Sequence, residues 1–195
     1  MPRVVDHEQR RREIAGAVWR TVARRGIEAA TMREIADEAG FSTGVLAHYF
    51  EDKDDLIVYA LRVSVERAAE RMRGSGGGSG LETLRAVLGE GLPLDEQRRG
   101  EMRVWINFWG RATGNDALGK EQARWYAVWR SAVRSLIEEC QRSGEIDPDL
   151  DAEREATTLV ALVDGIGIQA IYEPNRLPPE EQASLLNAHL RRLAK

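Results

Sequence analysis

Two short helix-forming segments lie next to each other in this sequence, and their spacing restricts the fold more than any other feature. Thr31 and Ser42 are typical first residues of a helix, because their hydroxyl groups accept hydrogen bonds from the free backbone amides of the first turn. Only Gly40 and Phe41 separate the first segment from Ser42. Two short helices joined by such a glycine-containing turn predict a helix-turn-helix at about residues 31–50.

The segments around this motif also have the pattern of helices. Asp6 is the expected cap of a helix that precedes the motif, and Gly26 stands where that helix would end in a left-handed residue. The next helix is expected to begin at Asp52 and to run to about Arg73. The run GSGGGSG at residues 74–80 is expected to be a plain flexible loop, because the Lys-Ser or Lys-Thr pair of a phosphate-binding loop does not follow it.

The pattern of the whole chain predicts helices only. No run of residues alternates between apolar and polar with period two, so no sheet is expected. We predict an all-α protein of about nine helices, with a three-helix domain that contains the helix-turn-helix at residues 1–52 and a helical bundle at residues 53–195. The remaining helices are expected near residues 81–91, 97–113, 115–143, 152–172 and 180–194.

Charge and composition narrow the class of protein. The net charge is −4, but residues 1–25 hold seven Arg, so this basic end can lie against phosphates while the rest of the chain is repelled. The single cysteine, Cys140, fits a reducing compartment, and the N-terminal residues lack the apolar region of a secretory signal. The most apolar stretch, residues 159–171, is shorter than the roughly 20 residues that cross a bilayer. We therefore expect a cytoplasmic protein that does not enter a membrane.

The second helix of the motif has the residues of a DNA-reading helix. Its first residues are small and polar, so its N-terminus can approach the major groove closely, and its free backbone amides attract phosphate. Thr43 and Val45 are expected to reach base edges, Val45 through a thymine methyl group. A helical corner that only packs remains the alternative from spacing alone. The predicted DNA-binding residues are Thr31, Arg33, Ser42, Thr43, Gly44, Val45, His48, Tyr49 and Lys53, of which His48, Tyr49 and Lys53 are expected to contact phosphates.

The run TMREIADEAGFSTGVLAHYFEDKDDL at residues 31–56 resembles the DNA-binding signature of TetR-family regulators. Ala47 departs from this signature, because many family members carry there a Tyr that contacts phosphate. The resemblance implies a repressor that a small-molecule effector releases from a near-palindromic operator. The matching positions are Gly26, Thr31, Ile35, Ala36, Ala39, Gly40, Phe41, Ser42, Gly44, Tyr49, Phe50, Lys53 and Leu56.

The second half of the chain resembles one branch of that family, which includes the choline-responsive repressor of betaine synthesis. The resemblance rests on Arg103, Trp105, Phe108 and Trp109 and on the run LVDGIGIQ at residues 162–169. It implies an effector pocket in this half of the chain, without identifying the effector.

Two sets of aromatic residues, one within residues 105–109 and one within residues 125–129, could line such a pocket. Within each set the residues recur at spacings of three and four, so each set shares one side of a helix. Facing aromatic helices can line a cavity for a cation such as a quaternary ammonium, but they can equally form an ordinary core. Asp164 lies in an apolar run, so it needs partners at a dimer interface or in the pocket. The candidate ligand-binding residues are Trp105, Phe108, Trp109, Trp125, Tyr126 and Trp129.

The last two predicted helices carry apolar residues on more than one side. A twofold four-helix bundle made of residues 152–172 and 180–194 from two chains would bury both sides, so we expect a homodimer. An enzyme is not expected, because His7, His48 and His189 are far apart in sequence and no motif for a metal site or a nucleophile occurs. We expect no cofactor. The remaining alternative is a helical protein-interaction module that never touches DNA.

Overall fold

The computed structural model describes residues 7–26, 30–74 and 80–195, and within these residues nine helices form the protein. The helices are α1 (His7–Arg25), α2 (Met32–Ala39), α3 (Thr43–Tyr49), α4 (Lys53–Gly74), α5 (Gly80–Gly89), α6 (Glu96–Ala112), α7 (Asp116–Ser143), α8 (Ala152–Tyr172) and α9 (Pro179–Leu193). One isolated antiparallel bridge joins Ile146 to Ala194, and no strand occurs in the described residues. The prediction of an all-helical protein is confirmed.

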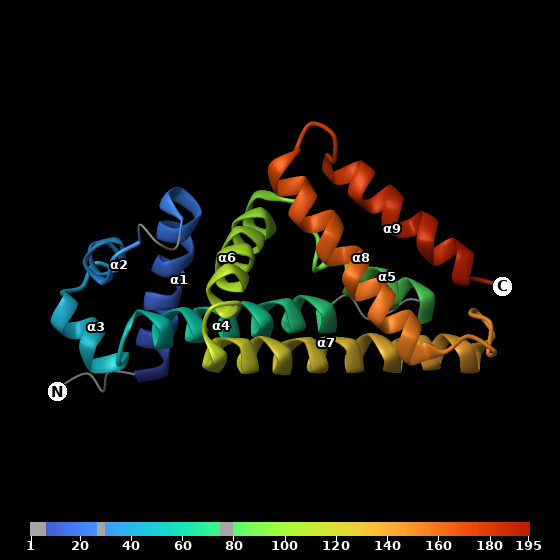
Figure 1. The fold of residues 1–195 in the computed structure, drawn as a ribbon, viewed down its shortest axis with the longest axis horizontal. Helices are drawn as coiled ribbons and strands as arrows, with labels where there is room; N and C mark the ends of the chain where they lie inside the picture. Colours follow the sequence, from blue (N-terminus) through green and yellow to red (C-terminus); the bar gives the residue numbers. More distant parts are fainter. Residues whose placement is uncertain (1–6, 27–29, 75–79) are drawn as a thin grey trace.

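The helices divide between two ends of an elongated molecule (Figure 1). The group α1, α2 and α3 lies at one end, and α4 leads from this group toward the remaining helices. Helix α9, at the end of the chain, lies away from the group α1, α2 and α3 in the same view. None of the described helices is long and apolar enough to span a bilayer.

The local signals of the helix-turn-helix act as the sequence predicts. The Thr31 hydroxyl accepts a hydrogen bond from the Glu34 amide at 3.2 Å, and the Glu34 carboxylate accepts one from the Thr31 amide at 3.0 Å. Gly40 ends α2 with a φ of 74°, which is the left-handed region that favours glycine. The Ser42 hydroxyl then caps α3 by accepting a hydrogen bond from the Val45 amide at 3.3 Å. The turn is therefore fixed by its own residues.

Two other predicted features lie partly or wholly outside the described residues. The expected helix cap at Asp6 lies outside the described residues, and so do residues 75–79 of the predicted glycine-rich loop. Gly26 does end α1 with a positive φ of 77°. The predicted breaks after residue 113 and after residue 143 also coincide with the ends of α6 and α7 to within one residue.

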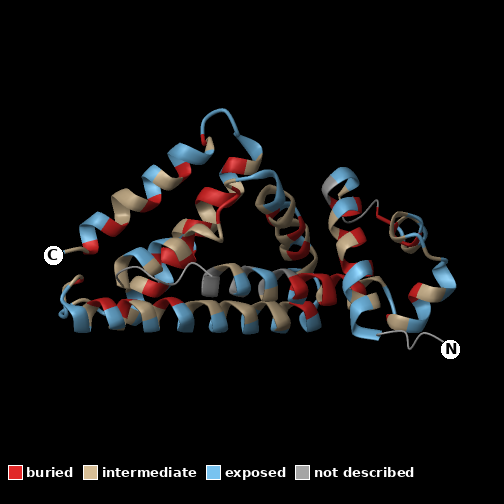
Figure 2. Ribbon diagram, turned by 180° about the vertical axis from the view of Figure 1, so that it is seen from behind, coloured by how far each residue is buried: buried red, intermediate tan, exposed pale blue. Residues whose placement is uncertain are grey.

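Two clusters of buried side chains hold these helices together, and Figure 2 shows buried residues at both ends of the molecule. The first cluster contains residues of α1 to α4 together with Val104 and Phe108 of α6. The second contains residues of α5, α7, α8 and α9. Helix α6 therefore connects the two ends, because its C-terminal half fills the first core while its Met102 lies against α8. The division of the chain at residue 52 stays a prediction.

Candidate DNA interface and effector site

Helix α3 is anchored by one side and exposed on the other. Leu46 is fully buried, and Phe50, which directly follows the helix, is almost fully buried. The residues predicted to face DNA lie on the other side: Ser42, Thr43, Gly44 and His48 are exposed, whereas Val45 and Tyr49 are partly buried. A short helix held in this way presents its N-terminus and one face to an external surface. Ala47, where the signature departs from the family pattern, is exposed on that face as well.

Three rings meet where α3 ends and α1 begins. The ring centroids of His48 and Tyr49 are 5.3 Å apart, and His7 lies 5.6 Å from His48 and 5.1 Å from Tyr49. Sequence reasoning missed His7, because it is separated from the motif by more than twenty residues and only the packing of α1 brings it there. His7 extends the predicted interface toward the start of α1.

The arginines of α1 interact with other parts of the protein, which limits the expected role of this basic segment. Arg20 and Arg24 both pair with Glu38 of α2, and Arg25 pairs with Glu34 at 2.5 Å. Arg10 lies over the Phe41 ring, with 4.8 Å between the guanidinium carbon and the ring centroid. The local excess of positive charge therefore helps to fix α2 and the turn, and only a part of it remains for phosphates.

Arg33 and Lys53 are the predicted cationic contacts, and they differ in their surroundings. Arg33 lies exposed in the first turn of α2 and forms no ion pair with any residue that the structure describes. Lys53 opens α4 and is partly buried. Hydrogen bonds from Thr31, together with the charges of Arg25 and Lys53, lower the pKa of Glu34. Arg33 is therefore the better placed of the two for a phosphate.

The candidate effector residues gather around a stacked pair of rings. Trp109 of α6 stacks on Tyr126 of α7, with 6.5 Å between ring centroids and 21° between ring planes. Trp105 lies 6.4 Å from Trp109 on the same helix. The guanidinium of Arg130 lies over the Tyr126 ring at 5.9 Å. Aromatic residues of α6 and α7 thus meet, as the two predicted faces require.

The other three aromatic residues have different surroundings. Phe108 is fully buried in the first core, where it packs with residues of α1 and α4. The ring of Trp125 lies under the guanidinium of Arg124, the preceding residue, with 5.2 Å between the guanidinium carbon and the ring centroid. Trp129 packs against the second core and approaches the turn between α5 and α6. Whether these residues bind a ligand together with the stacked pair stays a prediction.

Asp164 joins the stacked pair to α8. The Tyr126 hydroxyl donates a hydrogen bond to the Asp164 carboxylate at 2.8 Å. Burial raises the pKa of Asp164, and the hydrogen bond from Tyr126 opposes that rise. Burial and the neighbouring Asp164 charge also raise the pKa of the Tyr126 hydroxyl. No described cation forms an ion pair with Asp164, so its charge is compensated by one neutral hydroxyl group.

Several buried polar atoms around this pair lack a hydrogen-bond partner among the described residues. They include the indole nitrogens of Trp109 and Trp125 and the side-chain oxygen of Gln122, which is one turn from Tyr126 on α7. Similar unpaired atoms occur elsewhere in the described chain, for example on Trp19, Thr21 and Asn187, so they do not by themselves mark a site.

No group of three or more His, Cys, Asp or Glu is arranged to hold a metal ion in the part of the chain that the structure describes.

Comparisons with known proteins identify the family of both parts of the chain. Residues 15–60 match the family described as "Bacterial regulatory proteins, tetR family", and residues 80–195 match the family described as "BetI-type transcriptional repressor, C-terminal". The regulator PksA of Bacillus subtilis is 33% identical over 97% of this chain and 92% of its own length. The regulator BetI of Stenotrophomonas maltophilia is 31% identical over 87% of this chain and 85% of its own length.

Solved structures give the same result. A transcriptional regulator from Saccharomonospora viridis, crystallised in complex with choline, has a TM-score of 0.86 at 28% identity and covers 96% of this chain and 98% of that one. A TetR-family regulator from Rhodococcus has a TM-score of 0.85 at 28% identity, covering 96% and 100%. These relatives are regulators of transcription and not enzymes. The chain belongs to the TetR family of DNA-binding transcriptional regulators, and its C-terminal domain is of the BetI repressor type.

Proposed function

We propose that the protein is a homodimeric repressor that binds a near-palindromic operator and leaves it when a small organic cation binds among α6, α7 and α8. The Asp164 carboxylate is the observation that carries this proposal. It is partly buried, it has no cationic partner among the described residues, and its hydrogen-bond donor Tyr126 stacks on Trp109. A charge in such surroundings is unfavourable until an opposite charge joins it, and a bound cation would supply that charge.

A quaternary ammonium ion such as choline is the proposed effector class. Aromatic faces attract cations, and Trp gives the strongest interaction of the three aromatic side chains. The guanidinium of Arg130 already makes a contact of this kind with Tyr126. The related regulator from Saccharomonospora viridis was crystallised with choline. Trp105 and Trp129 remain candidate lining residues, whereas Phe108 fills the first core and Trp125 packs against Arg124.

The proposed dimer uses α8 and α9. Residues of these helices are buried on one side, while exposed and partly buried residues run along the other (Figure 2). The outer side includes Tyr172, which is 72% exposed, and Leu185, which is 39% exposed. A second copy of the same face across a twofold axis would cover these two apolar side chains.

The proposed operator contact follows from this dimer. Two copies of α3 would enter the major groove at half-sites about 34–36 Å apart, one turn of DNA. Because chromosomal DNA is the partner, the proposal includes action in the cytoplasm. The residues proposed to contact DNA are Thr31, Arg33, Ser42, Thr43, Gly44, Val45, His48, Tyr49 and Lys53.

Calorimetric titration of the full-length protein with choline tests the effector proposal. Asp164→Asn keeps the size of the side chain and removes its charge, so it should weaken choline binding by about tenfold or more, which is about 1.4 kcal/mol. Asp149→Asn is the matched control, because Asp149 is exposed and lies in the loop before α8. Betaine should bind more weakly than choline, because its carboxylate would meet that of Asp164.

Two results would contradict the proposed effector. One is a wild-type protein that binds neither choline nor tetramethylammonium. The other is an Asp164→Asn variant that binds choline as tightly as the Asp149→Asn control.

A further inference from the structure

The segment from Gly89, the last residue of α5, to Asp95, the N-cap of α6, contacts both the helices of the proposed effector site and helix α4, and we call these residues the α5–α6 turn. We infer that this turn transmits the state of the effector site to α4 through an ion pair between Glu90 and Arg71. The inference rests on the proposed function, because it needs an effector-dependent change at α7 and α8. Arg71 then couples the effector site to the DNA-binding helices, and neither of these sites needs Arg71 to bind its own ligand.

One side of the turn fits tightly against α7 and α8. A Cβ atom on Gly91 would lie 2.6 Å from Cγ1 of Val163 and 3.9 Å from Cζ2 of Trp129. Val163 directly precedes Asp164, and Trp129 is three residues from Tyr126 on α7. Close-packed interiors transmit small shifts because they contain little free space. A ligand that moves the Asp164–Tyr126 pair therefore has to displace this turn.

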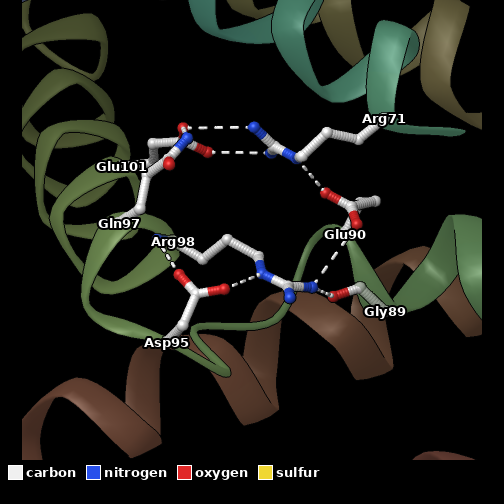
Figure 3. Close-up of polar contacts among 7 residues, drawn as sticks. All are labelled: Arg71, Gly89, Glu90, Asp95, Gln97, Arg98 and Glu101. Carbon is white, nitrogen blue, oxygen red and sulfur yellow. Dashed lines mark hydrogen bonds and ion pairs between the residues drawn. The ribbon is translucent and has the colours of Figure 1, made fainter. Parts of the chain in front are cut away.

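The other side of the turn is bound to α4 (Figure 3). Arg71 donates a hydrogen bond to the Glu90 carboxylate at 2.5 Å and a second one to Glu101 of α6 at 3.1 Å. The side chain of Glu90 is 12% exposed and that of Glu101 is 14% exposed. Enclosed ion pairs are screened less by salt than surface pairs, and their geometry is more specific. A displacement of Glu90 therefore changes the position of the Arg71 side chain.

A third residue makes the turn a rigid unit. Arg98, in the first turns of α6, donates hydrogen bonds to Asp95 at 2.8 Å, to the Gly89 carbonyl at 3.3 Å and to Glu90 at 3.4 Å (Figure 3). The two ends of the turn are thus held together by one guanidinium. A displacement of one end of the turn is therefore passed to the other end through Arg98.

Helix α4 connects Arg71 with the DNA-binding end of the molecule. It begins at Lys53, directly after α3, and its Asp54 pairs with Arg111 of α6. Residues of its first three turns, Leu56, Ile57 and 59–61, are buried in the first core with α1. A shift of its C-terminal part can therefore change the orientation of the elements packed on its N-terminal part.

Arg71→Gln in the full-length protein tests the inference. Each carboxylate keeps another partner in this variant, since Glu90 retains Arg98 and Glu101 retains Gln97, so the protein is expected to fold. Arg67→Gln is the matched control, because Arg67 is exposed on the same helix and makes no ion pair with a described residue. Glu90→Gln provides a second variant, should Arg71→Gln fail to fold.

Two measurements are compared among these proteins. A DNA duplex selected by the wild-type protein from a random library is used to measure affinity with and without choline. Amide hydrogen exchange of residues 89–95 is followed with and without the same duplex, which requires no effector. In the wild type and in Arg67→Gln we expect DNA to change the exchange of the turn, and choline to weaken DNA binding by a factor within the roughly 5- to 150-fold range of allosteric coupling.

In Arg71→Gln we expect DNA and choline each to bind within about threefold of the wild type, while the effect of choline on DNA affinity falls below about threefold. The DNA-dependent change in exchange at residues 89–95 should be lost as well. An Arg71→Gln variant with wild-type coupling overturns the inference, and so does a wild-type turn whose exchange DNA leaves unchanged. If choline binds no variant but the exchange results hold, the proposed effector class fails and the inference stands.

Discussion

At the scale of single residues, the surroundings of a charge determine what it can do. The sequence suggested that the arginines near the N-terminus would serve DNA, yet Arg20, Arg24 and Arg25 pair with glutamates of α2. Arg33, with no such partner among the described residues, is left to reach a phosphate. Asp164 differs from the acidic residues of these ion pairs, because its partner is one hydroxyl group and no described cation lies next to it.

Arg33→Ala should weaken operator binding for all sequences alike, because phosphate contacts carry no sequence information. The slope of log affinity against log salt should fall by about 1. Arg20→Ala is the comparison, since its guanidinium is already paired with Glu38, and it should leave the slope unchanged. Fluorescence anisotropy of a labelled duplex at several salt concentrations measures the affinity and the slope for each variant. Equal slopes for wild type and Arg33→Ala would show that Arg33 contacts no phosphate.

Binding of a cation at Asp164 should weaken on acidification, because only the ionised carboxylate attracts it. Burial raises the pKa of Asp164, so the loss of binding should begin at a higher pH than for an ordinary aspartate, whose pKa is 3.8.

The raised pKa of Asp164 also affects the stability of the protein. A carboxyl group whose pKa is higher in the folded state than in the unfolded state makes a stability contribution that is fully present below the unfolded-state pKa and is lost as the pH rises through the folded-state pKa. Asp164→Asn should therefore be at least as stable as wild type at pH 7. Urea unfolding that shows a less stable Asp164→Asn at pH 7 contradicts this.

At the scale of helices and turns, local signals were readable from the sequence and distant pairings were not. Thr31, Gly40 and Ser42 act through groups within a few residues of themselves, so their roles as caps follow from residue type and spacing. Arg71 and Glu90 are 19 residues apart, and Arg71 and Glu101 are 30 apart. Any Arg on α4 could have paired with any of many acidic residues, so only the fold reveals this network.

The aromatic faces show the same limit. Spacing placed the aromatic residues on α6 and α7, and Trp109 of α6 does stack on Tyr126 of α7. It could not distinguish Phe108, which fills a core, from Trp109, which stacks on Tyr126. That distinction depends on the angle at which α6 crosses its neighbours, and no local rule fixes such an angle.

Gly91→Ala should destabilise the protein, because its new methyl group would lie 2.6 Å from Val163, whose branched side chain has little rotamer freedom. Overpacking of this kind costs about 1–3 kcal/mol. Gly167→Ala should cost less, since the atom it meets is the end of the flexible Met102 side chain. Gly89→Ala is the control with open space around it. Denaturant unfolding measures the order, and a Gly91→Ala variant as stable as Gly89→Ala would contradict the tight fit of the turn.

At the scale of the whole molecule, two ends with different tasks are joined by α4 and α6. The first core holds α3 in place for DNA, and the second core holds the helices around Asp164. The regulator proposed here works only if a second copy places another α3 one DNA turn away. The outer sides of α8 and α9 are the surface that this assembly requires.

Leu185→Glu should therefore prevent dimerisation, because a twofold interface would bury two unpaired charges. The dimer dissociation constant is expected to rise by roughly 100-fold or more, since removing a partner from a buried charge costs about 3–5 kcal/mol. Val128→Glu is the matched control, because Val128 is an exposed apolar residue of α7, at 57% exposure, outside the proposed interface. Light scattering at micromolar concentration distinguishes them. A dimeric Leu185→Glu variant would rule out this surface.

The most direct test of the whole account is release of the protein from DNA by a cation, compared with release by a simple salt at matched ionic strength. A labelled duplex bound by the wild-type protein is titrated with choline chloride and, in parallel, with sodium chloride at the same concentration. We predict that choline releases the duplex at concentrations where sodium chloride does not, and that Asp164→Asn removes the difference. Identical release curves for the two salts would mean that only general screening acts, and would contradict an effector site among α6, α7 and α8.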